Sequence, residues 1–242
     1  NADLCSTGDS PELLVWGDSY GMHLMPGIQA VRPDLKVAQM TKSVCGPFLG
    51  IAPVNARYPV ESAAACIRYN DAVIDWVKKT PSIKAVVLGS TYGQFMNEGA
   101  KVLLPDGRIV EGKAHAAKAF ADTLAQLRAA GVRPVIVSPT PGDGSDIGRC
   151  LAKAAQWGID SDKCAFPRDV AEQRQREVLA FLRAQTPASE VVWLFDTICD
   201  QSRCKAAIGD VLLYRDAGHL SAEGSIEVAR SGGLRSALAA TR

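Results

Sequence analysis

The chain has 242 residues, of which 47% are apolar and 22% are charged, and its formal net charge is +1. This composition excludes a disordered chain, and the small charge argues against a nucleic-acid or acidic-membrane partner. The longest apolar runs, such as 85–89, are far too short to span a membrane. Because no linker divides the chain, we expect residues 1–242 to form one domain.

Predicted strands and helices alternate along the chain. Strands are expected at 13–16, 35–40, 83–88, 132–137 and 191–195. Helices are expected at 20–31, 62–79, 113–130, 147–157, 169–185 and 221–240, with Pro26 kinking or restarting the first and Ser221 capping the last. A hairpin is expected at 101–110 and loops at 43–58 and 89–99. This order predicts an α/β fold, a three-layer α/β/α sandwich of flavodoxin-like type around a mainly parallel five-stranded sheet, plus a small hairpin insertion.

Seven cysteines suggest disulfides and an oxidising compartment. Their spacing favours the pairs Cys45/Cys66, Cys150/Cys164 and Cys199/Cys204, although spacing alone does not fix connectivity. Cys5 is then left over, either free or paired outside this chain. A zinc site at Cys199-x4-Cys204 is the competing interpretation, but no second Cys/His pair lies nearby, so no metal is expected. The chain begins at Asn1 without Met, which predicts a processed protein or an excised domain.

The stretch LLVWGDSYGMH places Ser19 directly after the first predicted strand and at the start of a helix. Active sites of open parallel sheets form beyond the carboxyl ends of the strands. Free N–H groups at a helix start favour a developing oxyanion, and Gly17 and Gly21 permit a tight turn. Ser19 therefore suits a nucleophile, while a simple helix cap is the alternative role. Asp18 is expected to be a structural hydrogen-bonding group of the turn.

A nucleophilic serine needs a base that is itself oriented by a third group. The chain has three histidines: His115 is expected to face solvent on a long helix, and His23 has no evident carboxylate partner. His219 follows Asp216 by three residues, a spacing at which a carboxylate in a turn can reach the imidazole. A surface turn with a satisfied histidine is the alternative interpretation of this pair.

Taken together, Gly17-Asp18-Ser19 near the start and Asp216-x-x-His219 near the end resemble the SGNH/GDSL hydrolase superfamily. A second resemblance, to the SGNH domain fused to acyltransferase-3 membrane proteins, rests on three features. They are Asp216-x-x-His219-Leu220-Ser221-x-x-Gly224, the preceding Cys199, Cys204 and Leu213-Tyr214, and Cys45-Gly46-Pro47. Gly17-Asp18-Ser19-Tyr20-Gly21 also satisfies the G-x-S-x-G elbow of α/β-hydrolases. We reject that fold because only one strand fits before Ser19.

The resemblance implies a catalytic triad of Ser19, His219 and Asp216, with no cofactor. It implies an oxyanion hole from Ser19 and Gly46, with Thr91 as the third candidate. The family's third block is Gly-x-Asn-Asp, whereas this chain reads Gly89-Ser90-Thr91-Tyr92, so Thr91 stands where an Asn is expected. Removing one oxyanion donor costs about 2.7–4 kcal/mol of transition-state stabilisation, which predicts a slow or specialised enzyme or a replacement donor.

The resemblance also implies a function and a cellular setting. An acyl group, in particular acetyl, would be delivered by a membrane acyltransferase-3 domain and passed to a periplasmic or cell-surface glycan. The domain would be extracytoplasmic and tethered to the inner membrane in the full-length protein. A carbohydrate O-acetyl esterase with the same triad and a non-catalytic glycan-binding domain are the alternatives.

Two further features allow two interpretations each. Tyr92, Phe95 and Trp157 are expected either to stack on sugar rings or to fill the core. The loop at 141–145 has glycines typical of a phosphate cradle but lacks the Lys-Ser/Thr of a P-loop, so a flexible loop at the active-site rim is expected.

Overall fold

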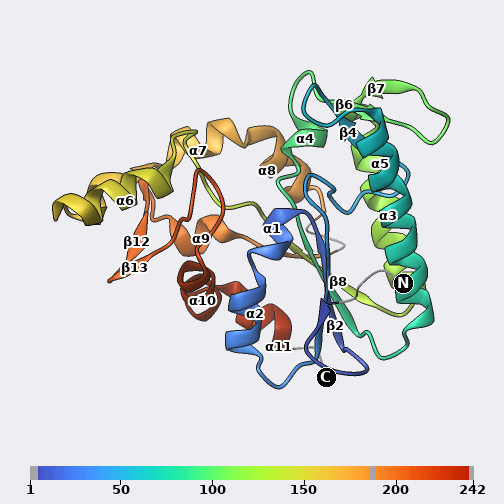
Figure 1. The fold of residues 1–242 in the computed structure, drawn as a ribbon, viewed down its shortest axis with the longest axis horizontal. Helices are drawn as coiled ribbons and strands as arrows, with labels where there is room; N and C mark the ends of the chain where they lie inside the picture. Colours follow the sequence, from blue (N-terminus) through green and yellow to red (C-terminus); the bar gives the residue numbers. More distant parts are fainter. Residues whose placement is uncertain (1–4, 186–188, 240–242) are drawn as a thin grey trace.

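A computed structural model describes residues 5–185 and 189–239 of the chain. Its centre is a sheet of six strands in the order β1-β3-β2-β5-β8-β10 (Figure 1). The strands are β1 (Cys5–Ser6), β2 (Leu13–Gly17), β3 (Val37–Thr41), β5 (Ala85–Gly89), β8 (Arg133–Val137) and β10 (Glu190–Val192). The five predicted parallel strands are confirmed, but the predicted total of five is wrong because β1 pairs antiparallel with β3. A two-residue edge strand is too short to leave a periodic signal.

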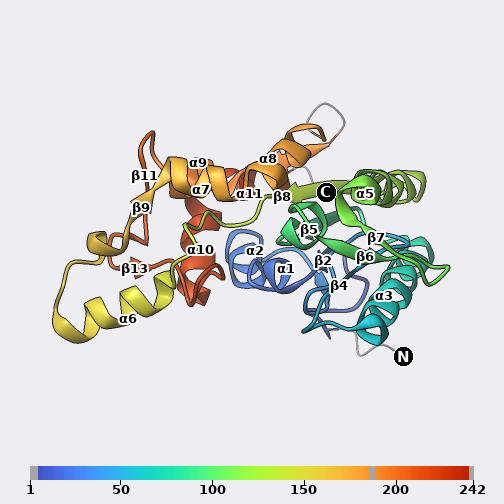
Figure 2. The ribbon, with the colours of Figure 1, turned by 90° about the horizontal axis from the view of Figure 1, so that it is seen from above.

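Helices cover both faces of the sheet, as the three-layer prediction requires (Figure 2). Every residue of β2 is buried, and its side chains alternate between two hydrophobic clusters. One cluster includes α2 (Met25–Val31), α10 (Ala222–Ser231) and α11 (Gly233–Ala239). The other includes α3 (Val60–Lys79), α5 (Gly112–Ala129) and α8 (Arg176–Arg183). Burial on both faces explains why the central strands read as continuous apolar runs.

Three long predicted helices are interrupted. The first consists of α1 (Ser19–Met22) and α2, which restarts with Pro26 in its first turn. The predicted helix at 169–185 is split at Gln175 into α7 (Arg168–Arg174) and α8. The last is split at Gly232 into α10 and α11, and its predicted end at Ala240 lies outside the described residues. Ser221 caps α10 as predicted, accepting a hydrogen bond from the Gly224 N–H at 2.8 Å.

Other segments differ from prediction in detail. The hairpin is present as β6 (Lys101–Leu103) and β7 (Ile109–Glu111), and β4 (Ala52–Val54), in the expected 43–58 loop, adds a third strand beside β6. Helix α4 (Gly93–Met96) lies in the expected 89–99 loop. The fifth predicted strand ends early, because α9 (Leu194–Ile198) follows β10. Helix α6 (Ile147–Trp157) has the predicted bounds.

Two segments of the chain, 147–167 and 203–212, form a lobe that projects from one side of the sheet (Figure 1). It holds α6, the short helix η1 (Ser161–Cys164) and β9 (Phe166–Pro167), β11 (Arg203–Cys204), β12 (Ala207–Ile208) and β13 (Val211–Leu212). Disulfides Cys150–Cys164 and Cys199–Cys204 lie here, and Cys45–Cys66 joins the loop after β3 to α3. The three predicted pairs are confirmed, and Cys5 is free and exposed. Within the described part of the chain, no helix has the length and apolar character of a membrane span.

Candidate active site

Ser19 lies where the chain order of the sheet reverses. Strand β2 has β3 on one side and β5 on the other, and such switch points form crevices at the carboxyl ends of strands. The backbones are crowded here: a Cβ on Gly17, whose φ is +155°, would lie 1.8 Å from the Gly89 carbonyl oxygen, and one on Gly89 would lie 2.7 Å from the Gly21 Cα. Close backbone packing therefore fixes the turn that carries Ser19.

Asp18 caps α1 and is buried, with 1% of its surface exposed. Its Oδ1 accepts from the Tyr20 N–H at 2.8 Å, and its Oδ2 accepts from the Ser90 hydroxyl at 2.7 Å and the Thr91 N–H at 3.1 Å. Burial raises the pKa of Asp18, although these three donors oppose that shift. Asp18 therefore joins the turn after β2 to the end of β5, in agreement with its predicted structural role.

Asp216 and His219 lie in a loop between β13 and α10, here called the Asp–His loop (Tyr214–Leu220). Its two ends form a β-bridge, and the Arg215 N–H donates to the His219 carbonyl at 2.9 Å. Asp216 Oδ1 accepts from the Gly218 N–H at 3.0 Å and the His219 N–H at 2.8 Å. Partial burial acts to raise the pKa of Asp216, but these N–H groups and the His219 ring outweigh it and leave the pKa lowered. Asp216 is therefore ionised at neutral pH.

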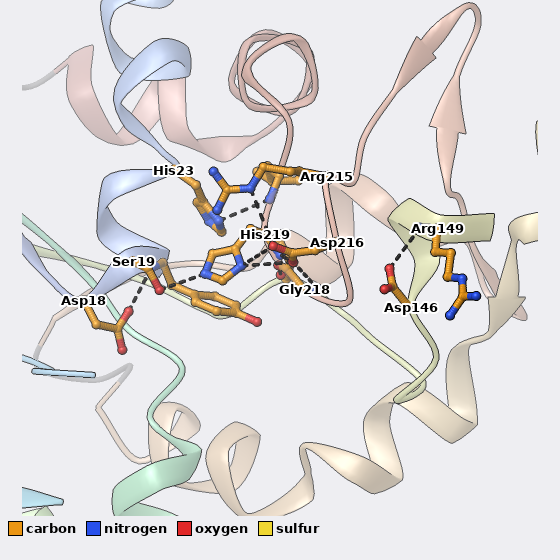
Figure 3. A network of polar contacts seen from close by, with 12 residues as sticks. Asp18, Ser19, His23, Asp146, Arg149, Arg215, Asp216, Gly218 and His219 are labelled. Atoms are coloured by element: carbon orange, nitrogen blue, oxygen red, sulfur yellow. Dashed lines mark hydrogen bonds and ion pairs between the residues drawn. The ribbon is translucent and has the colours of Figure 1, made fainter. Parts of the chain in front are cut away.

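The His219 ring lies between Asp216 and Ser19 (Figure 3). Its Nδ1 is 2.8 and 3.0 Å from the two carboxylate oxygens of Asp216, and its Nε2 is 2.7 Å from Ser19 Oγ. An ionised carboxylate only accepts hydrogen bonds, so Nδ1 carries the proton and Nε2 is free to accept one from the serine. The predicted residues come together across 200 positions of sequence, in an arrangement that can deprotonate Ser19.

The other two histidines do not take part in this arrangement. His23 is buried, and its Nδ1 accepts from the Leu220 N–H at 3.2 Å. Burial lowers the pKa of His23 to about 3, so the ring is neutral and its free nitrogen supports the Asp–His loop through this hydrogen bond. His115 lies on α5, where its Nδ1 is 3.1 Å from the Glu111 carbonyl. These positions agree with the expectation that neither is the base.

Two of the predicted oxyanion donors, the backbone N–H groups of Ser19 and Gly46, have no hydrogen-bond partner among the described residues. Gly46 packs against Ser90 so closely that a Cβ there would lie 2.7 Å from the Ser90 hydroxyl. The Thr91 N–H is used by Asp18, but its hydroxyl oxygen is buried and unpaired. The Thr91 N–H is therefore not free for an oxyanion, and only the Thr91 side chain stands where the family pattern has Asn.

The predicted aromatic, cysteine and loop candidates lie in different parts of the molecule. Tyr92 and Phe95 are fully buried and belong to the core, whereas Trp157 is 71% exposed at the end of α6 and does not fill the core. Cys199 is disulfide-bonded, and the described residues contain no group of three or more side chains that could hold a metal. In the 141–145 loop, Gly142 and Gly144 line a cavity beside the site.

Sequence reasoning missed the residues that support the site. The Tyr20 ring packs on His219 with 4.8 Å between centroids, and burial raises the pKa of Tyr20 to about 12, so it is neutral. Thr140 donates its hydroxyl to the Gly218 carbonyl, and Ser90 donates to Asp18. Ser90 and Thr140 each lie just beyond the carboxyl end of a parallel strand, which was the available signal.

Comparisons with known proteins bear on the family and the fold. A family model described as "SGNH domain (fused to AT3 domains)" matches residues 1–231. The periplasmic domain of a lipopolysaccharide acetyltransferase from Salmonella ser. Paratyphi A superposes with a TM-score of 0.66 at 17% identity, over 92% of this chain and 82% of that one. A GDSL-like lipase from Bacteroides thetaiotaomicron gives 0.50 at 10% identity, over 95% and 88%. At these identities the structural likeness concerns the fold, and no curated protein matches by sequence.

Proposed function

Because the chain belongs to the family of SGNH domains fused to AT3 domains, we propose that it transfers an O-acyl group, in particular acetyl, to a glycan hydroxyl through an acyl-enzyme on Ser19. The observation that carries the proposal is the continuous contact from Asp216 through His219 to Ser19 Oγ, with the last step at 2.7 Å. A lowered pKa at Asp216 supports it, because the carboxylate stays charged while the imidazole gains a proton.

In the first half-reaction, His219 Nε2 takes the Ser19 proton as Oγ attacks the carbonyl carbon of the acyl donor. The Oγ–C bond forms, the carbonyl electrons move onto oxygen, and the Ser19 and Gly46 N–H groups and the Thr91 hydroxyl stabilise that oxyanion. The intermediate then collapses, the bond to the leaving group breaks, and His219 returns the proton to the leaving group. Ser19 is left as an ester.

In the second half-reaction, a sugar hydroxyl attacks the Ser19 ester. His219 takes the hydroxyl proton, the new sugar ester forms, and the Oγ–C bond breaks as the proton returns to Ser19. Asp216 holds the imidazole in the required tautomer throughout and stabilises its charged form without becoming protonated. Water in place of the sugar would make the same residues an esterase.

The proposed setting follows from the family. In this proposal an AT3 domain is the partner that supplies the acyl group from the membrane. Residues 1–242, of which 1–231 match the family model, form one SGNH domain of a larger, membrane-tethered protein. Three disulfides support an oxidising, periplasmic location. A non-catalytic glycan-binding domain is a weaker proposal, because binding alone does not need a serine hydroxyl bonded to an oriented imidazole.

A time course of acetyl release and transfer from 4-nitrophenyl acetate tests the proposal, with and without a sugar acceptor, on the wild type and Ser19→Ala. Acetylated sugar from the wild type alone supports transfer. Release to water alone, dependent on Ser19, supports the esterase. Equal background rates in both proteins contradict catalysis by Ser19 and favour the binding domain.

A further inference from the structure

An open cavity of about 340 Å³ borders the Asp–His loop. Ala217 and Gly218 of that loop line it, together with Tyr20, whose ring packs on His219. Its volume lies at the lower end of the range of small-molecule sites, about 300–1,000 Å³. A ligand held here would therefore lie beside the base that the second half-reaction requires.

Two polar atoms among the lining residues are buried without a partner. They are the Thr91 hydroxyl oxygen and Gln175 Oε1. Gln175 lies at the break between α7 and α8, and its Nε2 donates to the Thr140 carbonyl at 2.8 Å, which fixes the amide at the wall of the cavity. Both oxygens are shielded from solvent, so they belong to the wall behind the cavity and do not contact a ligand within it.

The cavity carries one charge. Among the described residues that line it, Arg174 alone is charged, and its guanidinium makes no ion pair within the described part of the chain. The guanidinium lies over Gly144 so closely that a Cβ there would be 2.4 Å from its Cζ. The glycine thus provides the space for an arginine at the rim, and a guanidinium binds carboxylate or phosphate oxygens in pairs.

We infer that this cavity binds the acceptor sugar, and that this sugar carries an anionic group that pairs with Arg174. The inference rests on the proposed function, because the acceptor hydroxyl must reach His219 Nε2 while the acyl group is on Ser19. Gln175 forms part of the cavity wall, and the Thr91 side chain lies at its boundary with the oxyanion site. Carboxylate and phosphate share the required chemistry, and the test separates them.

The cavity wall is also connected to the Asp–His loop. Gln175 donates to the Thr140 carbonyl, the Thr140 hydroxyl donates to the Gly218 carbonyl, and the Gly218 N–H donates to Asp216 at 3.0 Å. The residues of the cavity wall thereby also hold the loop that positions Asp216.

The test measures binding to Ser19→Ala protein, which cannot turn over, by titration calorimetry with methyl glucuronide, glucose 1-phosphate and methyl glucoside. The same titrations are made with Arg174→Ala, Arg174→Lys and Arg108→Ala added to that background. Arg108 is an exposed arginine in the turn of the β6–β7 hairpin and is not among the residues that line the cavity. In parallel, Ser19-dependent release from 4-nitrophenyl acetate is measured for the Arg174 variants with Ser19 intact.

We expect at least one anionic sugar to bind about tenfold more tightly than methyl glucoside, the difference typical of one charge-assisted contact. Arg174→Ala removes this preference, Arg174→Lys keeps part of it, and Arg108→Ala leaves it unchanged. Whether the glucuronide or the phosphate is preferred identifies the anionic group. Equal binding of all three sugars, no binding of any, or a preference that survives Arg174→Ala overturns the inference. Failure of the proposed function appears separately, as ester release that does not depend on Ser19.

Discussion

Ser19 and His219 are held at the candidate active site by different structural means. Ser19 follows the central strand of the sheet, where three glycine backbones pack so closely that no side chain fits on Gly17. His219 belongs to the Asp–His loop, outside the sheet, where Asp216 keeps 41% of its side chain exposed. Packed backbone positions the nucleophile, whereas hydrogen bonds donated by Thr140 and Gly218 and one accepted by His23 position the base.

This difference predicts how substitutions around Ser19 and around Asp216 should change stability and activity. Close packing leaves no room for adjustment, so changes around Ser19 should reduce stability and activity together. Polar contacts in a loop can be exchanged one at a time, so changes around Asp216 should reduce activity while the fold survives. The following four changes test that contrast, from the largest expected effect to the smallest.

Asp216→Asn should lower kcat/KM by about 10⁴-fold, the effect typical of losing the carboxylate that sets the histidine tautomer. The midpoint of thermal unfolding should change little, because the amide oxygen can still accept from the two loop N–H groups. Steady-state hydrolysis of 4-nitrophenyl acetate and calorimetry measure both quantities. Asp210→Asn, an exposed acid in the turn between β12 and β13, is the control. An equal loss in both variants would contradict the assigned role.

Gly17→Ala should lower the free energy of unfolding by about 4 kcal/mol, because the new Cβ meets the Gly89 carbonyl and the backbone conformation is strained. Gly99→Ala is the matched control, since Gly99 also has a positive φ, +74°, but nothing lies within 4 Å of its Cβ position. That variant should lose only about 1–2 kcal/mol. Similar losses in urea unfolding would show that crowding does not hold the Ser19 turn.

His23 should make stability depend on pH. The unfolded chain protonates this ring near pH 6.5, whereas the folded chain does so only near pH 3. Stability from this group is therefore present above pH 6.5 and is lost as the pH falls toward 3, by about 3 kcal/mol between pH 7 and pH 4. His23→Asn keeps an acceptor for the Leu220 N–H but does not titrate, so its unfolding free energy should fall less steeply with acidification.

Urea unfolding at a series of pH values provides that comparison. His115→Asn serves as the control histidine change on α5. If the His23 and His115 variants keep the same pH dependence as the wild type, the buried ring does not carry the effect.

Removing Cys199–Cys204 should cost about 2 kcal/mol, as expected for closing a short loop. This disulfide lies next to the segment where the Leu213 N–H donates to the Ala206 carbonyl at 2.9 Å, just before the Asp–His loop. We expect Cys199→Ser/Cys204→Ser to lower kcat modestly, with the acetyl-release rate and the melting midpoint measured together. A drop in kcat as large as that of Asp216→Asn would mean that the lobe, rather than local hydrogen bonds, positions the base.

The sequence alone predicted those parts of the molecule that leave a local pattern in the chain. Buried strands appear as apolar runs, and Ser19, Asp216 and His219 stand in short motifs with fixed spacing. The break at Gln175 was missed because no glycine or proline marks it, whereas the break at Gly232 had a local signal, the pair Gly232-Gly233, that the prediction of one helix at 221–240 did not use. Arg174 and Gln175 carried no motif, since only the packing at the break between α7 and α8 places them at the cavity that borders the Asp–His loop.

Direct identification of the acylated residue tests the central claim. Wild-type protein is mixed with 4-nitrophenyl acetate, quenched in acid within the first turnover, digested and mapped by mass spectrometry, with Ser19→Ala treated identically. The account predicts one acetyl group on the wild-type peptide that contains Ser19 and none on that peptide in Ser19→Ala. Acetylation of another residue to the same extent in both proteins, with none on Ser19, would contradict it.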